Sequence, residues 1–335
     1  MALVPMRVLL DAATNGNYAV GAYNVNNMEQ IQAIMAAARR TLSPVIVQAS
    51  RGALKYSSLI YLRYLMQAAV EDNPNIPIAM HLDHGNSLDT VKSAIAQGFT
   101  SVMIDGSLKE DSKTPTTFDE NVEVTRRVVE YARPRGVTVE AELGTLGGIE
   151  DGVGSGRVNL TDPDQAEEFV DKTKVDALAV AIGTSHGAYK FKAEPKLALD
   201  LVREIHKRIP GTALVMHGSS SVPQELVDIV NKYGGRMPNA RGVPMEAIQS
   251  VIPYGVRKVN IDTDGRIAYT GAIRKIFAET PQVFDPRDYL GSARAALTEL
   301  VARKMQELGT AGHADEIEQK SLDDMKSFYR ALGLL

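Results

Sequence analysis

Residues 77–85 end an apolar run with three titratable side chains. The apolar residues 77–80 lead into His81, Asp83 and His84, and Gly85 then allows the chain to turn. A run of about four to eight apolar residues bounded by turn signals is typical of a buried strand. Strand stability does not favour ionisable groups at a strand end. The stretch is therefore either a polar strand terminus at the surface or part of a site that binds a cation and moves protons.

Histidines recur at the ends of other predicted strands. Of the six histidines in the chain, four lie at such ends. His84, His186 and His217 each end a different strand, and histidines that converge with carboxylates match a catalytic zinc or similar divalent site with an open position. The alternative is a rim of hydrogen-bonded polar residues without a metal. The side chains expected at a second metal position, or in hydrogen bonds to the first, are Asp105, Glu142 and His81.

A glycine-rich loop over residues 143–159 carries another candidate group. It is too long for a simple strand-to-helix turn and too polar to be buried, so it is either disordered or a lid over a site. Glu150 and Asp151 lie near its middle, where closure would bring a carboxylate onto bound substrate as a base. A solvated loop with incidental acidic residues is the alternative.

Composition excludes several classes of function. The 335-residue chain is 44% hydrophobic and 23% charged, which is ordinary for a soluble globular protein. Its formal charge of −4 gives no basic character, so we expect no nucleic-acid partner. The absence of cysteine excludes disulfides and thiol catalysis. No apolar run approaches the roughly 18–20 residues needed to cross a bilayer, and the N-terminus lacks a signal-peptide pattern. We therefore expect a cytoplasmic protein with no membrane partner.

Eight apolar segments, each followed by helical signals, organise the chain. Residues 28–42 are rich in alanine and unbranched side chains, and Gly98 closes a second helical stretch at 87–97. Asp162 is expected to cap a helix that begins at Pro163, and residues 221–224 open a helix over 225–232 in much the same way. The predicted strands are residues 18–25, 44–50, 78–84, 101–106, 138–144, 177–186, 213–218 and 258–262.

Eight strand–helix units predict a parallel α/β protein with both faces of the sheet covered. A (β/α)₈ barrel fits this number best, and we expect residues 1–335 to form a single domain with a C-terminal helical extension from about residue 288. A doubly wound open sheet is the alternative. It is disfavoured because no G-x-G-x-x-G follows the first strand and eight units exceed its usual number of about six. In a barrel, the strand ends named above would meet at one rim.

The loops after the seventh and eighth strands have the composition of phosphate-binding loops. In this fold they frequently hold phosphate through backbone N–H groups and hydroxyls. The same residue types also dominate ordinary turns, so composition alone does not indicate phosphate binding. The position of these loops after the seventh and eighth strands is what favours it. The residues concerned are Gly218, Ser219 and Ser220, then Asn260, Ile261, Asp262 and Thr263, with Gly187 as a further close amide.

Nine stretches occur in the order found in one enzyme family. They are AYNVNN, VIVQAS, HLDHG, SVMIDGS, VEAELGTLGGIEDG, AIGTSHGAYK, HGSSSVP, VRKVNIDTD and FDPRDYL, from near residue 20 to near residue 290. The chain therefore resembles the class II, metal-dependent fructose-1,6-bisphosphate aldolases, and more closely their longer Calvin-cycle type. The resemblance implies a TIM barrel that forms a homodimer or homotetramer and cleaves a ketose bisphosphate reversibly. It also implies Zn²⁺ or another divalent metal, and it admits a second metal ion and a monovalent cation.

The resemblance assigns a role to each matching residue. His84, His186 and His217 match the catalytic metal ligands, Asp83 matches the acid/base that handles the proton on the aldehyde-derived oxygen, and Glu150 matches the loop base. Asp105 and Glu142 match the second metal position, which His81 would support. The positions matching substrate contacts are Asn24 and Ser50 on the glyceraldehyde 3-phosphate side, Gly187, Gly218, Ser219, Ser220, Asn260, Ile261, Asp262 and Thr263 on the dihydroxyacetone phosphate side, and Arg287 at the far phosphate, often in a neighbouring subunit.

Related activities stay open beside fructose-bisphosphate cleavage. Tagatose-bisphosphate aldolase shares the metal and phosphate residues, and sedoheptulose 1,7-bisphosphate is a candidate additional substrate. A non-catalytic sugar-phosphate-binding barrel would be expected to have lost a ligand or the loop acid. A Schiff-base aldolase would need a lysine at a strand end, and neither Lys190 nor Lys258 is well placed. Many relatives have Gly-Gly-Ser-Gly where this chain has 218–221 as Gly-Ser-Ser-Ser, and the serines add hydroxyl donors to that loop.

Overall fold

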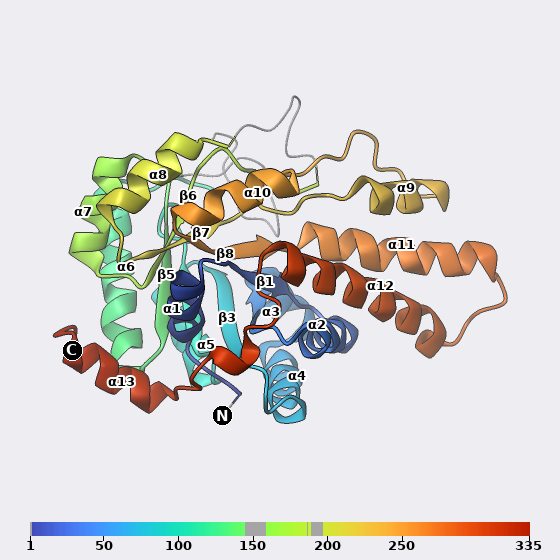
Figure 1. Cartoon of the computed structure of the whole chain (residues 1–335), viewed down its shortest axis with the longest axis horizontal. Coiled ribbons are helices and arrows are strands. Elements are labelled where there is room, and N and C mark those ends of the chain that lie inside the picture. Colours follow the sequence, from blue (N-terminus) through green and yellow to red (C-terminus); the bar gives the residue numbers. More distant parts are fainter. Residues whose placement is uncertain (1, 145–158, 186, 189–196) are drawn as a thin grey trace.

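The computed structural model describes residues 2–144, 159–185, 187–188 and 197–335. Eight parallel strands form a closed barrel in which each strand pairs with the next and β8 pairs with β1 (Figure 1). The predicted barrel is thus confirmed, and the open sheet is wrong. The strands are β1 Val20–Asn24, β2 Val45–Ser50, β3 Ile78–Gly85, β4 Ser101–Ile104, β5 Thr138–Leu143, β6 Ala177–Val180, β7 Ala213–Met216 and β8 Val256–Ile261.

Strand β6 is much shorter than its apolar sequence predicts. The expected strand runs over 177–186, but pairing in the barrel ends at Val180. The next residue, Ala181, instead exchanges hydrogen bonds with Thr161: the Thr161 amide donates to the Ala181 carbonyl at 3.0 Å, and the Ala181 amide donates to the Thr161 hydroxyl at 2.8 Å. Gly183 then has a φ of 101°, which favours glycine and ends the extended conformation.

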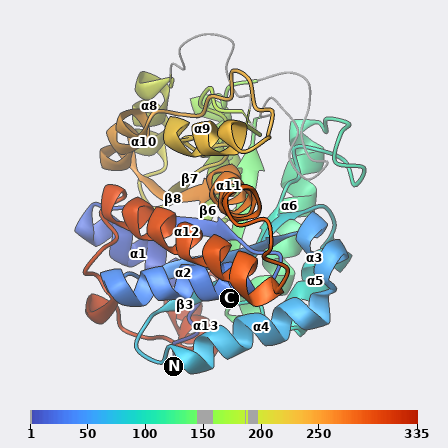
Figure 2. The same ribbon diagram turned by 90° about the vertical axis from the view of Figure 1, so that its right-hand side faces the viewer.

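Helices surround the barrel and cover the outer face of its strands (Figures 1 and 2). Within the described residues, no helix is both long and apolar enough to cross a membrane. The helices are α1 Met6–Gly16, α2 Met28–Thr41, α3 Arg51–Ser57, α4 Leu59–Asp72, α5 Leu88–Ala96, α6 Phe118–Ala132, α7 Pro163–Thr173, α8 Leu199–Arg208, α9 Gln224–Lys232, α10 Met245–Val251, α11 Thr263–Glu279, α12 Pro286–Glu307 and α13 Leu322–Ala331, with short 3₁₀ turns η1 Arg133–Arg135, η2 Ile252–Tyr254 and η3 Ala314–Glu316.

The amino end of the barrel is closed by apolar packing. Helix α1 contributes the buried side chains of Met6, Leu9 and Leu10 to one cluster with barrel residues such as Ile46 and Ala79. Their burial removes apolar surface from water at the end of the barrel where the strands begin. The opposite end of the barrel, where the strands finish, therefore remains for polar side chains.

Two predicted helix starts have different outcomes. Asp162 caps α7 as expected, because its carboxylate accepts the backbone N–H groups of Asp164 and Gln165 at 2.8 and 3.1 Å. Helix α9 begins after Pro223 without a side-chain cap, so the expected cap from the 221–224 stretch is wrong. The Ser221 hydroxyl makes its hydrogen bonds elsewhere.

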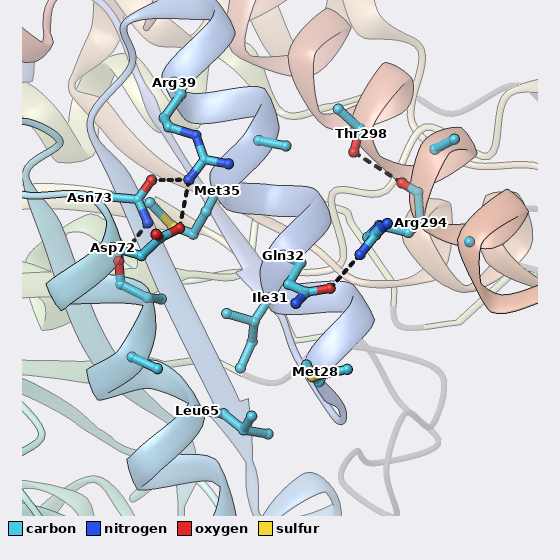
Figure 3. Close-up of a pocket in the computed structure, with 15 residues that line it drawn as sticks. Met28, Ile31, Gln32, Met35, Arg39, Leu65, Asp72, Asn73, Arg294 and Thr298 are labelled. Carbon is cyan, nitrogen blue, oxygen red and sulfur yellow. Dashed lines mark hydrogen bonds and ion pairs between the residues drawn. The ribbon is translucent and has the colours of Figure 1, made fainter. Parts of the chain in front are cut away.

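Helices α11 and α12 form a hairpin that extends away from the barrel (Figure 1). Helix α12 starts at Pro286, close to residue 288, where the C-terminal extension is expected to begin. Helix α12 returns along α2, where the Arg294 guanidinium donates to the Gln32 side-chain oxygen at 2.7 Å (Figure 3). A hollow of about 680 Å³ lies between α2, α4 and α12, lined by apolar side chains such as Met28 and Leu65, and none of the candidate site residues lines it.

Candidate active site

The carboxyl ends of the strands bring together side chains that are far apart in sequence. Asp83 and His84 lie near the end of β3, Asp105 follows β4, Glu142 belongs to β5 and His217 follows β7. All five side chains are buried. The structure thus gathers most of the predicted ionisable site residues at one end of the barrel. His186, Glu150 and Asp151 lie outside the described residues.

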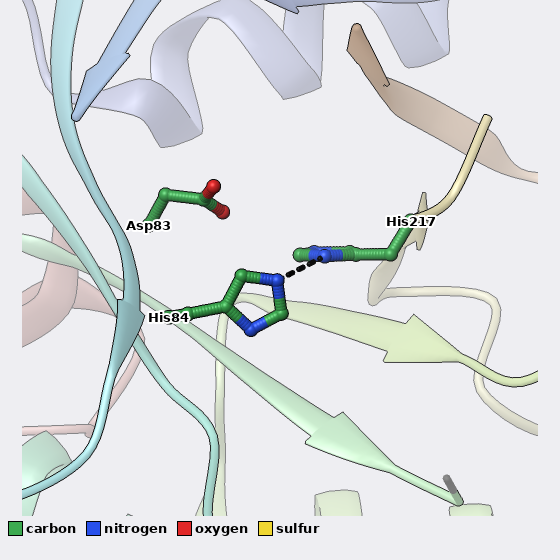
Figure 4. A group of neighbouring side chains, drawn as sticks. All are labelled: Asp83, His84 and His217. Carbon is green, nitrogen blue, oxygen red and sulfur yellow. Dashed lines mark hydrogen bonds between the residues drawn. The ribbon is translucent and has the colours of Figure 1, made fainter. Parts of the chain in front are cut away.

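His84 and His217 face one another at the centre of this end (Figure 4). His84 Nε2 lies 3.1 Å from His217 Nδ1, and the two ring planes are nearly perpendicular. Asp83, His84 and His217 offer donor atoms that all lie within 4.8 Å of one another. Two nitrogens bound to one tetrahedral zinc ion are about 3.3 Å apart, so the observed spacing suits a shared metal. His84 has a φ of 50°, a left-handed backbone conformation that is uncommon outside glycine and often occurs at functional sites.

The Asp83 carboxylate is held by three amide side chains. Asn24 donates to Oδ2 at 3.1 Å, Asn260 donates to Oδ1 at 3.3 Å, and Gln48 lies 3.4 Å from Oδ2. Burial alone would raise the pKa of Asp83, but positive charge at His84, His217 and Lys258 lowers it to about 2. Asp83 is therefore ionised at neutral pH and fixed in orientation.

A second group of ligand atoms uses the other nitrogen of His84. His84 Nδ1 lies 3.5 Å from Asp105 Oδ2 and 4.0 Å from Glu142 Oε2. Burial and the neighbouring Asp105 raise the pKa of Glu142 well above its usual range, because two buried carboxylates repel one another. Ser107 donates to Asp105 at 2.6 Å and helps to fix it. This group could hold a second cation, or it could orient His84 through Nδ1.

A chain of ionisable residues lies buried next to His217. The Glu140 carboxylate bridges Lys258 Nζ at 2.8 Å and His217 Nε2 at 2.9 Å. His81 Nε2 lies 3.5 Å from Glu140 Oε2. Glu140, Lys258 and His81 are completely buried. Lys258 and a hydrogen bond from His217 lower the pKa of Glu140 although burial raises it, so Glu140 is ionised and accepts the His217 Nε2 proton. His217 Nδ1 is then the nitrogen that faces His84.

Sequence reasoning missed the importance of Glu140 and Lys258. The sequence presents Lys258 only as a poorly placed Schiff-base lysine, whereas the structure buries its amine against Glu140 inside the barrel. His81 also belongs to this chain, with Nδ1 2.7 Å from the Ser101 hydroxyl, rather than to the group with Asp105 and Glu142. The available signal was the alternation of side-chain direction along β5, which places Glu140 and Glu142 on the same side of the strand.

The predicted substrate residues lie around the same end of the barrel, with one exception. Ser219, Ser220 and Thr263 are buried, Ser50 caps α3 through the Ala53 amide, and Asp262 pairs with Arg266 at 2.6 Å. Ile261 ends β8, and Gly187 and Gly218 have φ angles of 86° and 60°. Arg287 stands apart at the outer tip of the α11–α12 hairpin, where its exposed guanidinium pairs with Asp285.

Comparisons with known proteins agree with this geometry. A family model described as fructose-bisphosphate aldolase class-II matches residues 4–313. A fructose-bisphosphate aldolase of Giardia intestinalis is 56% identical over 332 residues, which cover 98% of this chain and 100% of that protein. One from Nostoc commune is 54% identical and covers 98% and 96%. The crystal structure of the YdjI aldolase from Escherichia coli K12 has a TM-score of 0.74 at 28% identity and covers 93% and 99%. The chain therefore belongs to the class-II fructose-bisphosphate aldolase family.

Proposed function

We propose that this aldehyde-lyase cleaves fructose 1,6-bisphosphate reversibly to dihydroxyacetone phosphate and glyceraldehyde 3-phosphate, with a divalent metal held at the carboxyl end of the barrel. The observation that carries the proposal is the convergence of His84 Nε2 and His217 Nδ1 beside Asp83. His186 is the third proposed ligand by its match to the family motif. Zinc is the proposed metal because imidazole ligands with an open position suit it.

The residues present fit such a metal in charge as well as in spacing. Buried carboxylates surround His84, and burial opposes its protonation, yet Asp83, Asp105 and Glu142 raise the pKa of His84 to about 10. A site that attracts a proton this strongly is a site that favours a cation. A bound divalent metal supplies Lewis-acid stabilisation of the negative charge that develops on the substrate oxygen.

Asp83 is proposed to move the proton on the oxygen that becomes the aldehyde. Cleavage between C3 and C4 requires the C4 hydroxyl to lose its proton, and the ionised Asp83 carboxylate can accept it. The amides of Asn24 and Asn260 fix the two carboxylate oxygens, so that little reorientation is needed. In the condensation direction the same carboxyl group returns the proton.

Glu150 is the proposed base at the carbon of dihydroxyacetone phosphate. This proposal rests on its match to the loop base of the family. A base on a loop can approach the carbon from the side opposite to the strand ends. In the cleavage direction the Glu150 carboxyl group delivers the proton to that carbon, and in condensation it removes it.

The two phosphates are proposed to bind at opposite sides of the site. The triose phosphate side uses Gly187, the Gly218–Ser219–Ser220 loop and the 260–263 segment, while Asn24 and Ser50 contact the glyceraldehyde 3-phosphate half. Arg287 lies in the first turn of α12, at the tip of the hairpin that extends away from the barrel, so we propose that it contacts a phosphate bound to a neighbouring molecule. We accordingly propose a homo-oligomer, either a dimer or a tetramer.

Removal of metal tests this function directly. The purified protein is expected to cleave fructose 1,6-bisphosphate, to lose activity with a chelator, and to regain it when zinc or another divalent ion is added. Tagatose 1,6-bisphosphate and sedoheptulose 1,7-bisphosphate assayed in parallel give the substrate preference. Cleavage that resists the chelator would refute the metal mechanism, and a preference for tagatose bisphosphate would correct the substrate.

Glu140 is expected to control metal affinity without touching the metal. Because its carboxylate fixes the tautomer and orientation of His217, Glu140→Gln should weaken zinc binding about 10- to 100-fold. Zinc affinity can be measured by competition with a chromophoric chelator, with the exposed Glu246→Gln as the matched control. Since Glu140→Gln leaves the buried Lys258 unpaired, the double variant Glu140→Gln/Lys258→Met should recover stability but not zinc affinity. Unchanged zinc affinity in both variants would remove Glu140 from this role.

A further inference from the structure

A buried carboxylate outside the candidate metal site organises the loop after β7. Asp264, in the first turn of α11, is completely buried. Its Oδ2 accepts hydrogen bonds from the Ser221 amide and the Ser221 hydroxyl, both at 3.0 Å, and its Oδ1 accepts the Val222 amide at 2.7 Å. The Ser221 hydroxyl therefore points to Asp264 instead of capping α9.

The loop that Asp264 holds has an unusual backbone conformation. Val222 has a φ of 49°, in the left-handed region that a β-branched residue rarely adopts. Gly218 begins the same loop, also with a positive φ. Such conformations persist only when surrounding contacts impose them. Hydrogen bonds from both Ser221 and Val222 to one fixed carboxylate provide that constraint.

Lys304 connects the same loop to helix α12. It is only 3% exposed, and its Nζ donates to the Ser221 hydroxyl at 2.8 Å and to Glu307 at 3.1 Å. Lys304 Nζ also lies 3.8 Å from Asp264 Oδ2. The Ser221 hydroxyl thus accepts from Lys304 and donates to Asp264, so that it links the two buried charges. A buried ammonium requires such partners, because burial without them is unfavourable.

The connection of residues 234–245 braces the same loop from the other side. The Val243 amide donates to the Ser220 carbonyl at 3.1 Å, and the Arg241 amide donates to the Ala188 carbonyl at 3.0 Å. A Cβ atom at position 242 would lie 2.2 Å from the Ser220 carbonyl oxygen, so only glycine allows the two backbone segments to approach this closely. The connection therefore ties the loop after β7 to Ala188, next to Gly187.

We propose that Asp264 and Lys304 are positioning residues that hold the 218–222 loop in the conformation that binds the triose phosphate. The inference rests on the proposed function of Gly218, Ser219 and Ser220. Phosphate binding by backbone N–H groups and hydroxyls depends on their directions, and these directions are set by the fixed turn at Ser221. It also gives the helix α12 a role in substrate binding within its own chain.

Lys304→Met tests this role in the intact, zinc-loaded protein. We expect the KM for fructose 1,6-bisphosphate and the inhibition constant for inorganic phosphate to rise together by about 10- to 100-fold, the size of effect that a small displacement of binding groups produces. Zinc content should not change, and kcat should fall much less than KM rises, because the lost interaction serves binding. Lys172→Met, at an exposed position of α7, is the matched control and should behave as the wild type.

Ser221→Ala is a second and smaller change that removes only the linking hydroxyl. Ser221→Ala should also raise the inhibition constant for inorganic phosphate, and it provides a test of the inference if Lys304→Met does not fold. An inhibition constant that stays at the wild-type value in Ser221→Ala, while the wild type cleaves substrate and is inhibited by phosphate, would overturn this inference alone. A wild type that neither cleaves fructose 1,6-bisphosphate nor is inhibited by phosphate would overturn the proposed function, and this inference with it.

Discussion

Replacement of His84 by alanine is expected to lower kcat/KM for fructose 1,6-bisphosphate by roughly 10³-fold or more, since a Lewis-acid metal contributes several kcal/mol. The reason is that His84 belongs to both groups of ligand atoms, with Nε2 toward His217 and Nδ1 toward Asp105 and Glu142. Steady-state rates and the zinc content of the purified variant are the measurements, and both should fall.

His313→Ala is the matched control for this substitution. His313 stacks on Tyr18 and pairs with Glu316, away from the strand ends, so its removal should leave zinc content intact. A His84→Ala variant with the activity and zinc content of the wild type would refute the assignment of His84 as a ligand.

Asp83→Asn is expected to reduce cleavage by about 10²- to 10⁴-fold, the usual contribution of a general acid–base group. The amide keeps the size of the side chain but cannot accept the C4 hydroxyl proton. Zinc content should be unchanged, because the neighbouring imidazoles remain. The kcat for cleavage and the exchange of the carbon-bound proton of dihydroxyacetone phosphate should be measured on the same preparation.

The two rates separate Asp83 from the loop base. Proton exchange at dihydroxyacetone phosphate is assigned to Glu150, so it should persist in Asp83→Asn while cleavage falls. Asp89→Asn, at an exposed position of α5, serves as the control. Equal loss of both rates would mean that Asp83 acts on the ketose half as well, and retention of both would remove it from proton transfer.

The barrel could be predicted from sequence because each strand carries its own signal. Apolar runs bounded by turn residues mark all eight strands, and parallel strands covered on both faces leave few alternatives. The end of β6 could not be predicted in this way, since Ala181 and Ile182 continue the apolar pattern although Ala181 pairs with Thr161. That exchange depends on a residue 20 positions away along the chain. The single-domain interpretation of residues 1–335 stays a prediction.

The composition of the site was more predictable than its internal contacts. Residue type and strand position placed Asp83, His84 and His217 together, because strand ends meet at one rim. The separate position of His81 depends on which faces of β3, β4 and β5 lie inside the barrel, and on the contact of Lys258 with Glu140. Similarly, the sequence around Ser221 is that of a helix cap, and only the burial of Asp264 redirects its hydroxyl. Tertiary contacts determine the position of His81 and the direction of the Ser221 hydroxyl, so neither can be predicted from the local sequence pattern.

We propose that His84 Nε2 and His217 Nδ1 would hold one divalent metal ion. Anomalous diffraction at the zinc absorption edge, from crystals of the zinc-loaded protein, locates that ion directly. The account predicts a peak about 2.0–2.1 Å from both nitrogens, with His186 as the third ligand. A peak found only on the His84 Nδ1 side, between Asp105 and Glu142, or no peak at either position, would contradict it.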